Sequence, residues 1–313
     1  MATVGVDIGG SKIAAVLLTK AGAIGGSVWR PHDERGAVDG AVDVVGLVAA
    51  AVVELSTSSQ EPIDCVGVSI AAWLSADRRR VLLAANLGVS DAPLGQVLTE
   101  RLGVPVFLQN DGDATAYAEY VRGAGQGART LVAIALGTGV GGGVVINGQV
   151  LVGSGGLGGE LGHLQVESDG PRCTCGGVGC LELYASGRAV AEAAIGQLGA
   201  ATSITAVDVV TAARANDGEA IDILAAAGRA VGRAVGRIAA VVDPDLVVLS
   251  GSLAESAGDL VIEPARAELR RCWPLAAVSD PVPIRLGSCG RAAAALGAAE
   301  MARAALELQA VHG

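Results

Sequence analysis

Short apolar runs alternate with glycine turns at the start of the chain. Residues 3–7 form an apolar run that ends in Asp7, and residues 12–18 form a second run after the turn Ile8-Gly9-Gly10-Ser11. Runs of this length, bounded by glycine, are typical of strands in a hairpin. We therefore expect a strand at 3–7, a strand at 12–18, a turn at 19–23 and a third short strand.

The same pattern recurs in the middle of the chain. A run at 130–136 precedes the glycine-rich loop 137–143, a short run at 144–146, the dipeptide Asn147-Gly148 and a run at 149–152. Asn-Gly between apolar runs is a strong hairpin signal. A repeat of this kind predicts a duplicated fold of two lobes, each presenting one glycine hairpin to a shared cleft. That cleft is the expected active site.

Helical sequence follows each copy of the repeat. We expect helices at 38–55, 185–198 and 219–242, and the last leads through Asp243-Pro244 into a strand at 246–249. The alternation of helices and strands indicates an α/β fold.

A polar pair, Asn110-Asp111, lies between the two copies. The apolar run 104–108 reads as a strand, and residues 114–120 are expected to be helical, so Asp111 should lie at a strand end beside a helix N-terminus. No linker of low complexity separates the lobes, and the repeat itself places the boundary near residue 115. The predicted lobes are 1–115, completed by a helix at about 295–313, and 116–294.

Composition narrows the class of protein. The chain has 313 residues, of which 51% are hydrophobic but only 2% aromatic, so its interior must be aliphatic. Its formal charge of -10 argues against nucleic acid or an anionic membrane as a partner. The first residues do not have the pattern of a secretory signal, and no stretch reads as a membrane span, so we expect a cytoplasmic protein.

Both glycine turns are candidates for contact with phosphate. In the segment from Asp7 to Lys12, a carboxylate precedes two glycines, so backbone N–H groups can approach phosphate oxygens while the acid helps to hold hydrated Mg²⁺. A purely structural turn is the alternative. The loop 137–143 holds five glycines and Thr138. Neither turn fits a P-loop or a dinucleotide fingerprint.

One histidine and three cysteines form the most specific pattern in the sequence. His163 follows Glu160-Leu161-Gly162, and Cys173, Cys175 and Cys180 lie within eight residues of one another. Together they offer the four ligands of a structural zinc site, which leaves no position for a catalytic water. A redox pair is the alternative, but Cys173 and Cys175 are too close in sequence for an unstrained disulfide.

The pair Asn110-Asp111 offers an amide that can orient a hydroxyl and a carboxylate that can accept its proton during phosphoryl transfer. The alternative for Asp111 is a helix N-cap, a common role of aspartate.

Taken in order, these motifs resemble the ROK family of repressors, open reading frames and kinases, and most closely its bacterial glucokinases of the actinobacterial type. The resemblance covers nearly the whole chain, and also includes Glu182 and the segment Asp243-Pro244. It implies a two-lobed actin-like fold of the ribonuclease H-like, hexokinase/actin superfamily, with the active site in the interdomain cleft.

The family resemblance also implies roles for individual residues. Asp111 would be the base in ATP-dependent phosphorylation of a hexose at its 6-hydroxyl, and Mg²⁺ would lie near Asp7. The protein would form a homo-oligomer, either a dimer or a tetramer. The sugar would be bound by Asn110, Asp111, Glu160, His163 and Glu182, zinc by His163, Cys173, Cys175 and Cys180, and ATP by Asp7, Gly9, Gly10, Ser11, Lys12, Gly137, Thr138, Gly139 and Gly251.

Two segments depart from the family pattern around the sugar site, Ala71-Ala72-Trp73 and Gly88-Val89-Ser90. Glucose is the favoured substrate, and an N-acetylhexosamine kinase is the alternative. From another class, a sugar-responsive transcriptional regulator would need a DNA-binding helix-turn-helix ahead of Asp7, where the sequence leaves no space. A catalytically silent sugar-binding protein is disfavoured by Asp111 and both glycine loops.

Overall fold

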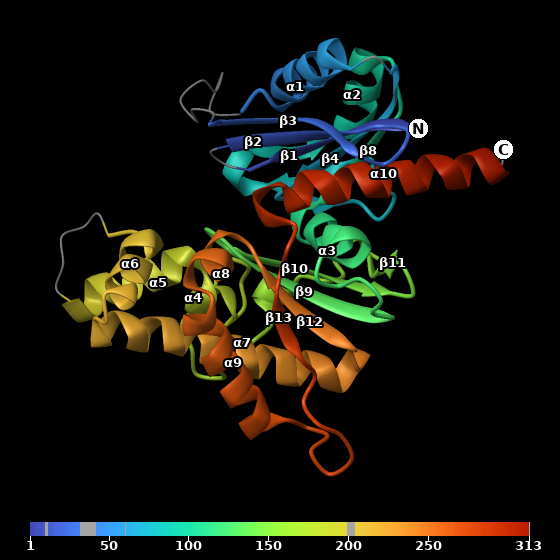
Figure 1. Ribbon diagram of the computed structural model, residues 1–313. Coiled ribbons are helices and arrows are strands. Elements are labelled where there is room, and N and C mark those ends of the chain that lie inside the picture. Colours follow the sequence, from blue (N-terminus) through green and yellow to red (C-terminus); the bar gives the residue numbers. More distant parts are fainter. Residues whose placement is uncertain (10–11, 32–41, 60, 199–203, 313) are drawn as a thin grey trace. The chain divides into compact units, whose positions relative to one another are not determined.

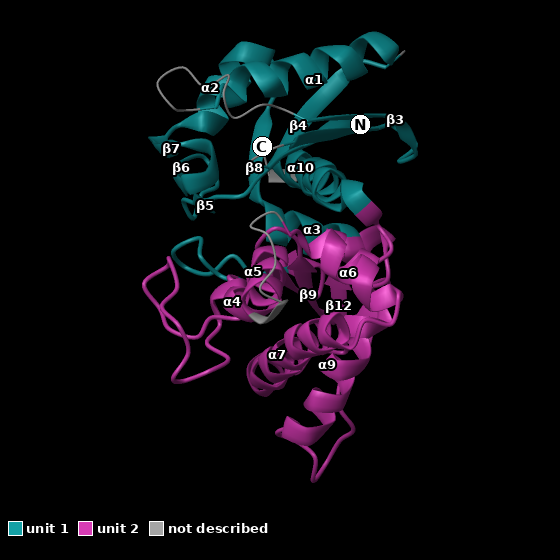
Figure 2. Ribbon diagram, turned by 90° about the vertical axis from the view of Figure 1, so that its left-hand side faces the viewer, with its two compact units in different colours: residues 1–118, 150–159, 291–313 teal, residues 119–149, 160–290 magenta. Residues whose placement is uncertain are grey.

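The chain forms two compact units. The computed structural model describes residues 1–9, 12–31, 42–59, 61–198 and 204–312. Unit 1 comprises Met1–Ala118, Val150–Gly159 and Arg291–Gly313, and unit 2 comprises Glu119–Gln149 and Glu160–Gly290 (Figure 2). Residues 150–159, which the sequence analysis placed in the second lobe, belong to unit 1 because Gly156 packs against the 74–76 backbone: a Cβ there would lie 2.5 Å from the carbonyl oxygen of Leu74.

Unit 1 is built on a five-stranded sheet with the order β3-β2-β1-β4-β8. The first three strands form the antiparallel meander that the sequence predicted, and β4 and β8 continue it in parallel. Every residue of β1 is buried, and all of its residues except Thr3 and Asp7 are apolar or glycine, as expected of a strand that is covered on both faces. The strands are β1 (Ala2–Ile8), β2 (Lys12–Leu18), β3 (Ile24–Pro31), β4 (Ile63–Ile70) and β8 (Val106–Asn110).

Helices cover both faces of this sheet. Helices α1 (Val44–Ser58) and α2 (Leu94–Leu102) lie on one face, and α10 (Ala293–His312) lies on the other (Figure 1). Gly5 and Gly67 let α10 approach closely, since a Cβ at either position would lie 1.9 Å from a carbonyl oxygen of that helix. The predicted helix at 38–55 is observed from Val44, and residues 38–41 lie outside the described part of the chain.

A small three-stranded sheet completes unit 1. It consists of β5 (Trp73–Leu74), β6 (Val81–Ala84) and β7 (Val89–Ala92), with the short 3₁₀ helix η2 (Ala85–Leu87) between the last two. Both segments that depart from the family pattern lie here: Ala71-Ala72-Trp73 leads into β5, and Gly88-Val89-Ser90 leads into β7.

Helix α3 (Asp111–Arg122) begins directly after β8. The sequence predicted this helix but placed its first residue at 114, three residues too late. The observed start confirms that Asp111 lies at a strand end and a helix N-terminus at once.

Unit 2 repeats the plan of unit 1. Its sheet has the order β11-β10-β9-β12-β13, in which β9 and β10 form an antiparallel hairpin and β12 runs parallel to β9. Asn147 and Gly148 both have positive φ, as the predicted two-residue turn requires. The strands are β9 (Thr130–Leu136), β10 (Val140–Ile146), β11 (Gln149–Val150), β12 (Leu246–Ser250) and β13 (Ile284–Leu286).

Two sequence predictions in this region were wrong. Residues 141–143 belong to β10 and pair with β9, so the loop predicted at 137–143 is a tight turn at 137–139. Glycine is used within the strand because Leu161 packs against it. A Cβ at Gly142 would lie 2.8 Å from the Leu161 side chain. The strand predicted at 149–152 ends at Val150.

Helices of unit 2 share an aliphatic core with β9 and β12. Helix α7 matches the prediction at 219–242 to within one residue, and α5 matches the prediction at 185–198 to within two residues, because the short helix α4 ends at Ala185. Within the described residues, none of the helices combines the length and the apolar character needed to cross a membrane. The helices are α4 (Glu182–Ala185), α5 (Gly187–Leu198), α6 (Ala206–Arg214), α7 (Gly218–Val242), α8 (Ser252–Ala257) and α9 (Asp259–Cys272).

Candidate active site

Asp7 lies near the end of β1 and is only 9% exposed. The register between β1 and β4 places Ser69 beside it, and the Ser69 hydroxyl donates a 2.8 Å hydrogen bond to Asp7 Oδ1. Burial, followed by the negative charge of Asp111, raises the pKa of Asp7 to about 6, against the smaller opposing effects of Ser69 and Lys12. Two carboxylates of unit 1, Asp7 and Asp111, are therefore close enough to repel each other.

The Asn110 side chain caps α3. Its Oδ1 accepts hydrogen bonds from the backbone N–H groups of Gly112 (2.8 Å) and Asp113 (3.1 Å), and its Nδ2 donates to the carbonyl oxygen of Ala72 at 3.2 Å. Asp111 Oδ1 accepts a hydrogen bond from the adjacent Gly112 N–H at 3.0 Å. The capping role considered for Asp111 thus belongs mainly to Asn110.

The carboxylates of Asp7 and Asp111 suit a hard divalent cation. Mg²⁺ prefers carboxylate oxygens and keeps several water molecules, and a cation would relieve the repulsion that raises the pKa of Asp7. These donors fit Mg²⁺, which when bound would neutralise charge on the phosphates of a nucleotide.

The first glycine turn is described in part. The backbone N–H of Gly9 donates to the carbonyl oxygen of Lys12 at 3.0 Å, which closes the turn between β1 and β2. Gly10 and Ser11, both predicted to contact ATP, lie outside the described residues. Lys12 is the first residue of β2, and its charge acts on Asp7.

The second glycine turn is packed against the start of α5. Gly137 N–H donates to the Gly139 carbonyl oxygen (3.0 Å), and the carbonyl oxygens of Gly137 and Thr138 accept from the N–H groups of Gly187 (2.7 Å) and Arg188 (3.3 Å). Fewer backbone N–H groups can therefore converge on a phosphate than the sequence suggested, because Gly137 N–H is already used within the turn.

Glu182 lies against this same turn. Its Oε2 accepts a 3.0 Å hydrogen bond from Val140 N–H, and a Cβ on Gly139 would lie 2.5 Å from that oxygen. Its Oε1 lies 3.4 Å from Arg188. Glu182 was predicted from the resemblance to bind the sugar, and the structure shows that its carboxylate holds the turn in place.

Gly251, the residue directly after β12, packs against the start of the second glycine turn. It has a φ of +88°, and a Cβ there would lie 2.5 Å from the carbonyl oxygen of Leu136, the residue before Gly137. Only glycine satisfies both conditions. The structure thus brings together three predicted sites of unit 2, the turn 137–139, Glu182 and Gly251.

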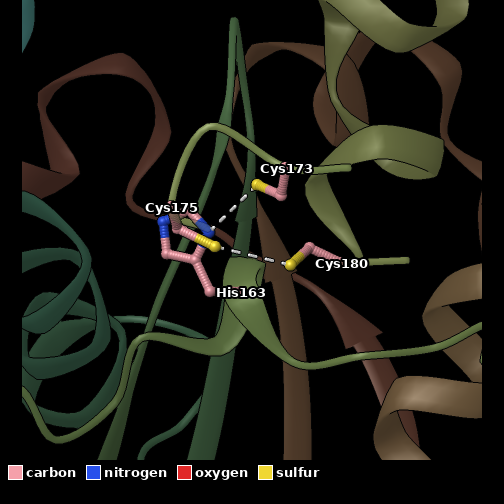
Figure 3. A group of neighbouring side chains, drawn as sticks. All are labelled: His163, Cys173, Cys175 and Cys180. Atoms are coloured by element: carbon pink, nitrogen blue, oxygen red, sulfur yellow. Dashed lines mark hydrogen bonds between the residues drawn. The ribbon is translucent and has the colours of Figure 1, made fainter. Parts of the chain in front are cut away.

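His163, Cys173, Cys175 and Cys180 converge on one point (Figure 3). All four potential ligand atoms lie within 4.8 Å of one another, with Cys173 Sγ 3.7 Å from His163 Nδ1 and Cys175 Sγ 3.7 Å from Cys180 Sγ. Tetrahedral ligands at ordinary Zn–S and Zn–N distances would be separated by about 3.5–3.8 Å. The cluster therefore fits a closed, structural zinc site.

The zinc cluster is connected to the second turn. His163 ends the 3₁₀ helix η3 (Leu161–His163), and Gly162 packs so tightly that a Cβ would lie 2.0 Å from the carbonyl oxygen of Val140. Glu160 directly precedes this helix. A metal on His163 would therefore fix Glu160 and His163 relative to the turn at 137–139.

Sequence reasoning missed several buried polar residues, among them Ser69 and Glu119. Ser69 carries a weak signal, as a polar residue near the end of an apolar run, but only the sheet register shows that it faces Asp7. Glu119 is fully buried, and its carboxylate accepts from the N–H groups of Ala124, Ser288 and Cys289. The last two are about 170 positions away, so no local pattern could reveal this contact.

Comparison with known proteins identifies the family. A model of the ROK family matches residues 3–305. The chain belongs to the ROK family. Its ROK relatives include the glucokinase of Streptomyces coelicolor, 33% identical over 320 residues that cover 96% of this chain and 97% of that protein. They also include the N-acetylmannosamine kinase of Yersinia pseudotuberculosis, 32% identical over 256 residues that cover 82% of this chain and 84% of that protein.

A solved ROK structure is similar over the whole fold. The ROK family glucokinase of Streptomyces griseus, crystallised in complex with glucose and AMPPNP, matches with a TM-score of 0.84 and 32% identity, covering 97% of this chain and 100% of that one. These similarities confirm the predicted family and the two-lobed actin-like fold class.

Proposed function

We propose that this ROK-family protein transfers the terminal phosphoryl group of ATP to the 6-hydroxyl of a hexose, and that glucose is the preferred acceptor. The enzyme class, an ATP-dependent hexose kinase, is supported by the glucokinase of S. coelicolor at 33% identity. The observation that carries the choice of glucose is the likeness to the S. griseus glucokinase, whose crystals contain glucose and AMPPNP.

Asp111 is proposed as the general base. Its carboxylate would accept the proton of the sugar hydroxyl as that oxygen attacks the phosphorus atom, while the bond to the leaving ADP breaks. Its place at the first residue of α3, directly after Asn110, supports this role. The negative charge that Asp111 exerts on Asp7 supports a cation-binding pair.

Sugar binding is assigned to Asn110, Glu160, His163 and Glu182, together with Asp111. Asn110 uses its amide oxygen for the α3 cap and one N–H for Ala72, so the second N–H of its amide is the group proposed to contact the sugar. Zinc on His163, Cys173, Cys175 and Cys180 would hold Glu160 and His163 in position without joining the reaction.

Nucleotide binding is assigned to the two glycine turns. Gly9, Gly10, Ser11 and Lys12 would contact ATP from unit 1, and Gly137, Thr138, Gly139 and Gly251 from unit 2, with Mg²⁺ held near Asp7. The close packing of Gly139 and Gly251 supports this assignment, because backbone without side chains can approach phosphate oxygens. The cytoplasmic location and the homo-oligomeric state stay predictions.

An N-acetylhexosamine kinase is the second candidate. The N-acetylmannosamine kinase of Y. pseudotuberculosis is 32% identical, almost as similar as the glucokinases. The departures at 71–73 and 88–90 lie in the small sheet of unit 1 and concern segments that border the sugar site in the family.

An ADP-release assay with Mg-ATP and a panel of sugars tests the proposal. Glucose, mannose, fructose, N-acetylglucosamine and N-acetylmannosamine would each be supplied over a range of concentrations. We expect kcat/KM for glucose to exceed that of every other sugar by about tenfold or more, the discrimination that one or two pocket contacts provide. Preference for an N-acetylhexosamine would transfer the assignment to the second candidate, and turnover of no sugar would contradict both.

A further inference from the structure

The loop between β5 and β6 makes a buried ion pair with the first turn of α3. Arg78 Nη2 lies 2.5 Å from Asp113 Oδ2, and the side chains of Arg78 and Asp113 are only 12% and 1% exposed. Asp113 is two residues after Asp111. The loop thus reaches the helical turn that carries the proposed base.

A second contact connects the same two segments. Asn110 Nδ2 donates to the carbonyl oxygen of Ala72, the residue just before β5. The hairpin formed by β5 and β6 is therefore joined to the start of α3 at two points, Ala72 and Arg78. These points flank Asp111 in the sequence of α3, through Asn110 and Asp113.

The loop that carries Arg78 is held by its own hydrogen bonds. Ser75 N–H donates to the Arg80 carbonyl oxygen (3.0 Å), and Arg78 N–H donates to the Ser75 carbonyl oxygen (2.8 Å). Gly95 of α2 donates its N–H to the Arg79 carbonyl oxygen at 3.2 Å. Arg78 consequently projects from a fixed support rather than from an unconstrained loop.

This arrangement is costly for stability. Arg78 has a φ of +56°, a backbone conformation that residues other than glycine and asparagine rarely adopt. Its Nε and Nη1 atoms are buried with no hydrogen-bond partner among the described residues. A buried ion pair with unsatisfied donors contributes little or nothing to the free energy of folding relative to an apolar pair. The contact between Arg78 and Asp113 is therefore better explained by the placement of the first turn of α3 than by a contribution to the stability of the fold.

We propose that Arg78 is a positioning residue, which fixes the first turn of α3 through Asp113 and so holds the Asp111 carboxylate in its reactive place. The inference rests on the proposed function for the role of Asp111, but the fixing of the turn itself does not. Phosphoryl transfer depends on precise placement, and a displacement of about 1 Å can reduce the rate about 100-fold.

Four variants separate positioning from stability. Arg78→Met leaves Asp113 buried without its cation, and the double variant Arg78→Met/Asp113→Asn removes both charges while keeping similar volumes. Arg78→Lys keeps the charge but loses the planar guanidinium. Arg80→Met is the matched control, because Arg80 belongs to the same loop and pairs with Asp91 at 2.7 Å on the exposed surface.

Three quantities are measured for each variant: the Tm, kcat with KM for ATP and glucose, and the hydrogen-exchange rates of the Gly112 and Asp113 amides, which donate to Asn110 Oδ1. We expect Arg78→Met to lower the Tm and the double variant to restore it. In the double variant kcat should remain about tenfold or more below wild type, with KM for ATP within about twofold, and the two amides should exchange about tenfold faster. The control variant Arg80→Met should have the same kcat and the same amide exchange rates as wild type.

Recovery of kcat and of amide protection together with the Tm would overturn the proposal, since the pair would then be merely structural. If the double variant does not regain the Tm of wild type, the variant Arg78→Lys provides the test. Unchanged kcat and unchanged hydrogen-exchange rates of the Gly112 and Asp113 amides in Arg78→Lys would overturn the proposal. A lower kcat together with faster exchange of these amides would support it. If wild type phosphorylates no sugar, the proposed function fails, and the exchange rates alone decide whether Arg78 fixes the turn.

Discussion

At the scale of single residues, Asp7 is a buried carboxylate whose charge opposes stability. Its pKa is raised to about 6 by burial and by Asp111, so the folded protein binds this proton more tightly than the unfolded chain does. The stabilising effect of the protonated group is complete below about pH 4 and is lost as the pH rises through 6. Above that pH the buried charge costs on the order of 3 kcal/mol.

The variant Asp7→Asn tests this balance. Its amide oxygen can still accept from Ser69, whereas the buried charge is removed. In Mg²⁺-free buffer at pH 8 we expect urea unfolding to give a free energy of unfolding at least equal to that of wild type, and the difference between the two proteins should shrink at pH 5. In a separate assay with Mg-ATP, we expect the variant to lose kinase activity. A variant clearly less stable than wild type at pH 8 would contradict the assigned pKa.

Residues whose role depends on local spacing could be predicted from the sequence. The four cluster residues, His163 and the three cysteines, were identified from their spacing, and the structure brings their ligand atoms together. Arg78 could not be identified, because its partner Asp113 lies 35 positions away and only the packing of the β5–β6 loop on α3 joins them. The capping role of Asn110 was given to its neighbour because both residue types cap helices.

At the scale of elements, strand positions followed well from the hydrophobic pattern. The predicted strands at 12–18 and 130–136 are observed with those bounds. The predicted extent of the second glycine loop was wrong because glycine lowers strand propensity, yet Gly141–Gly143 pair with β9 as strand residues. Gly142 also packs against Leu161 of η3, a residue that is distant in the sequence, so no local pattern could reveal why glycine is used in this strand.

The loop from His163 to Cys180 is expected to depend on its metal. In unit 2 its four side chains lack a strand or a long helix to hold them, so the bonds to zinc would supply the stability. We expect purified protein to contain about one zinc per chain, and Cys175→Ser to lower both the zinc content and the Tm. Metal analysis and thermal unfolding measure both, with Cys65→Ser, a buried cysteine of unit 1, as the comparison. Full zinc content and an unchanged Tm in Cys175→Ser would exclude the site.

At the scale of the whole molecule, a duplicated plan underlies both units. Each sheet begins with an antiparallel hairpin closed by a glycine turn and continues with parallel strands. Internal repetition of apolar runs is visible in the sequence, which is why the fold class could be predicted and then confirmed by the family match. The identity of the sugar could not be predicted from the sequence, because sugar specificity depends on a few side chains rather than on the repeat.

The measurement that tests the account most directly compares wild type with Asp111→Asn, using ADP release for turnover and calorimetry for glucose binding. The substitution removes the proposed base with little change in volume. We predict that kcat falls by about 100-fold or more while the Kd for glucose changes by no more than a few-fold. Unchanged turnover, or a loss of glucose binding as large as the loss of turnover, would contradict the role of Asp111 as the base.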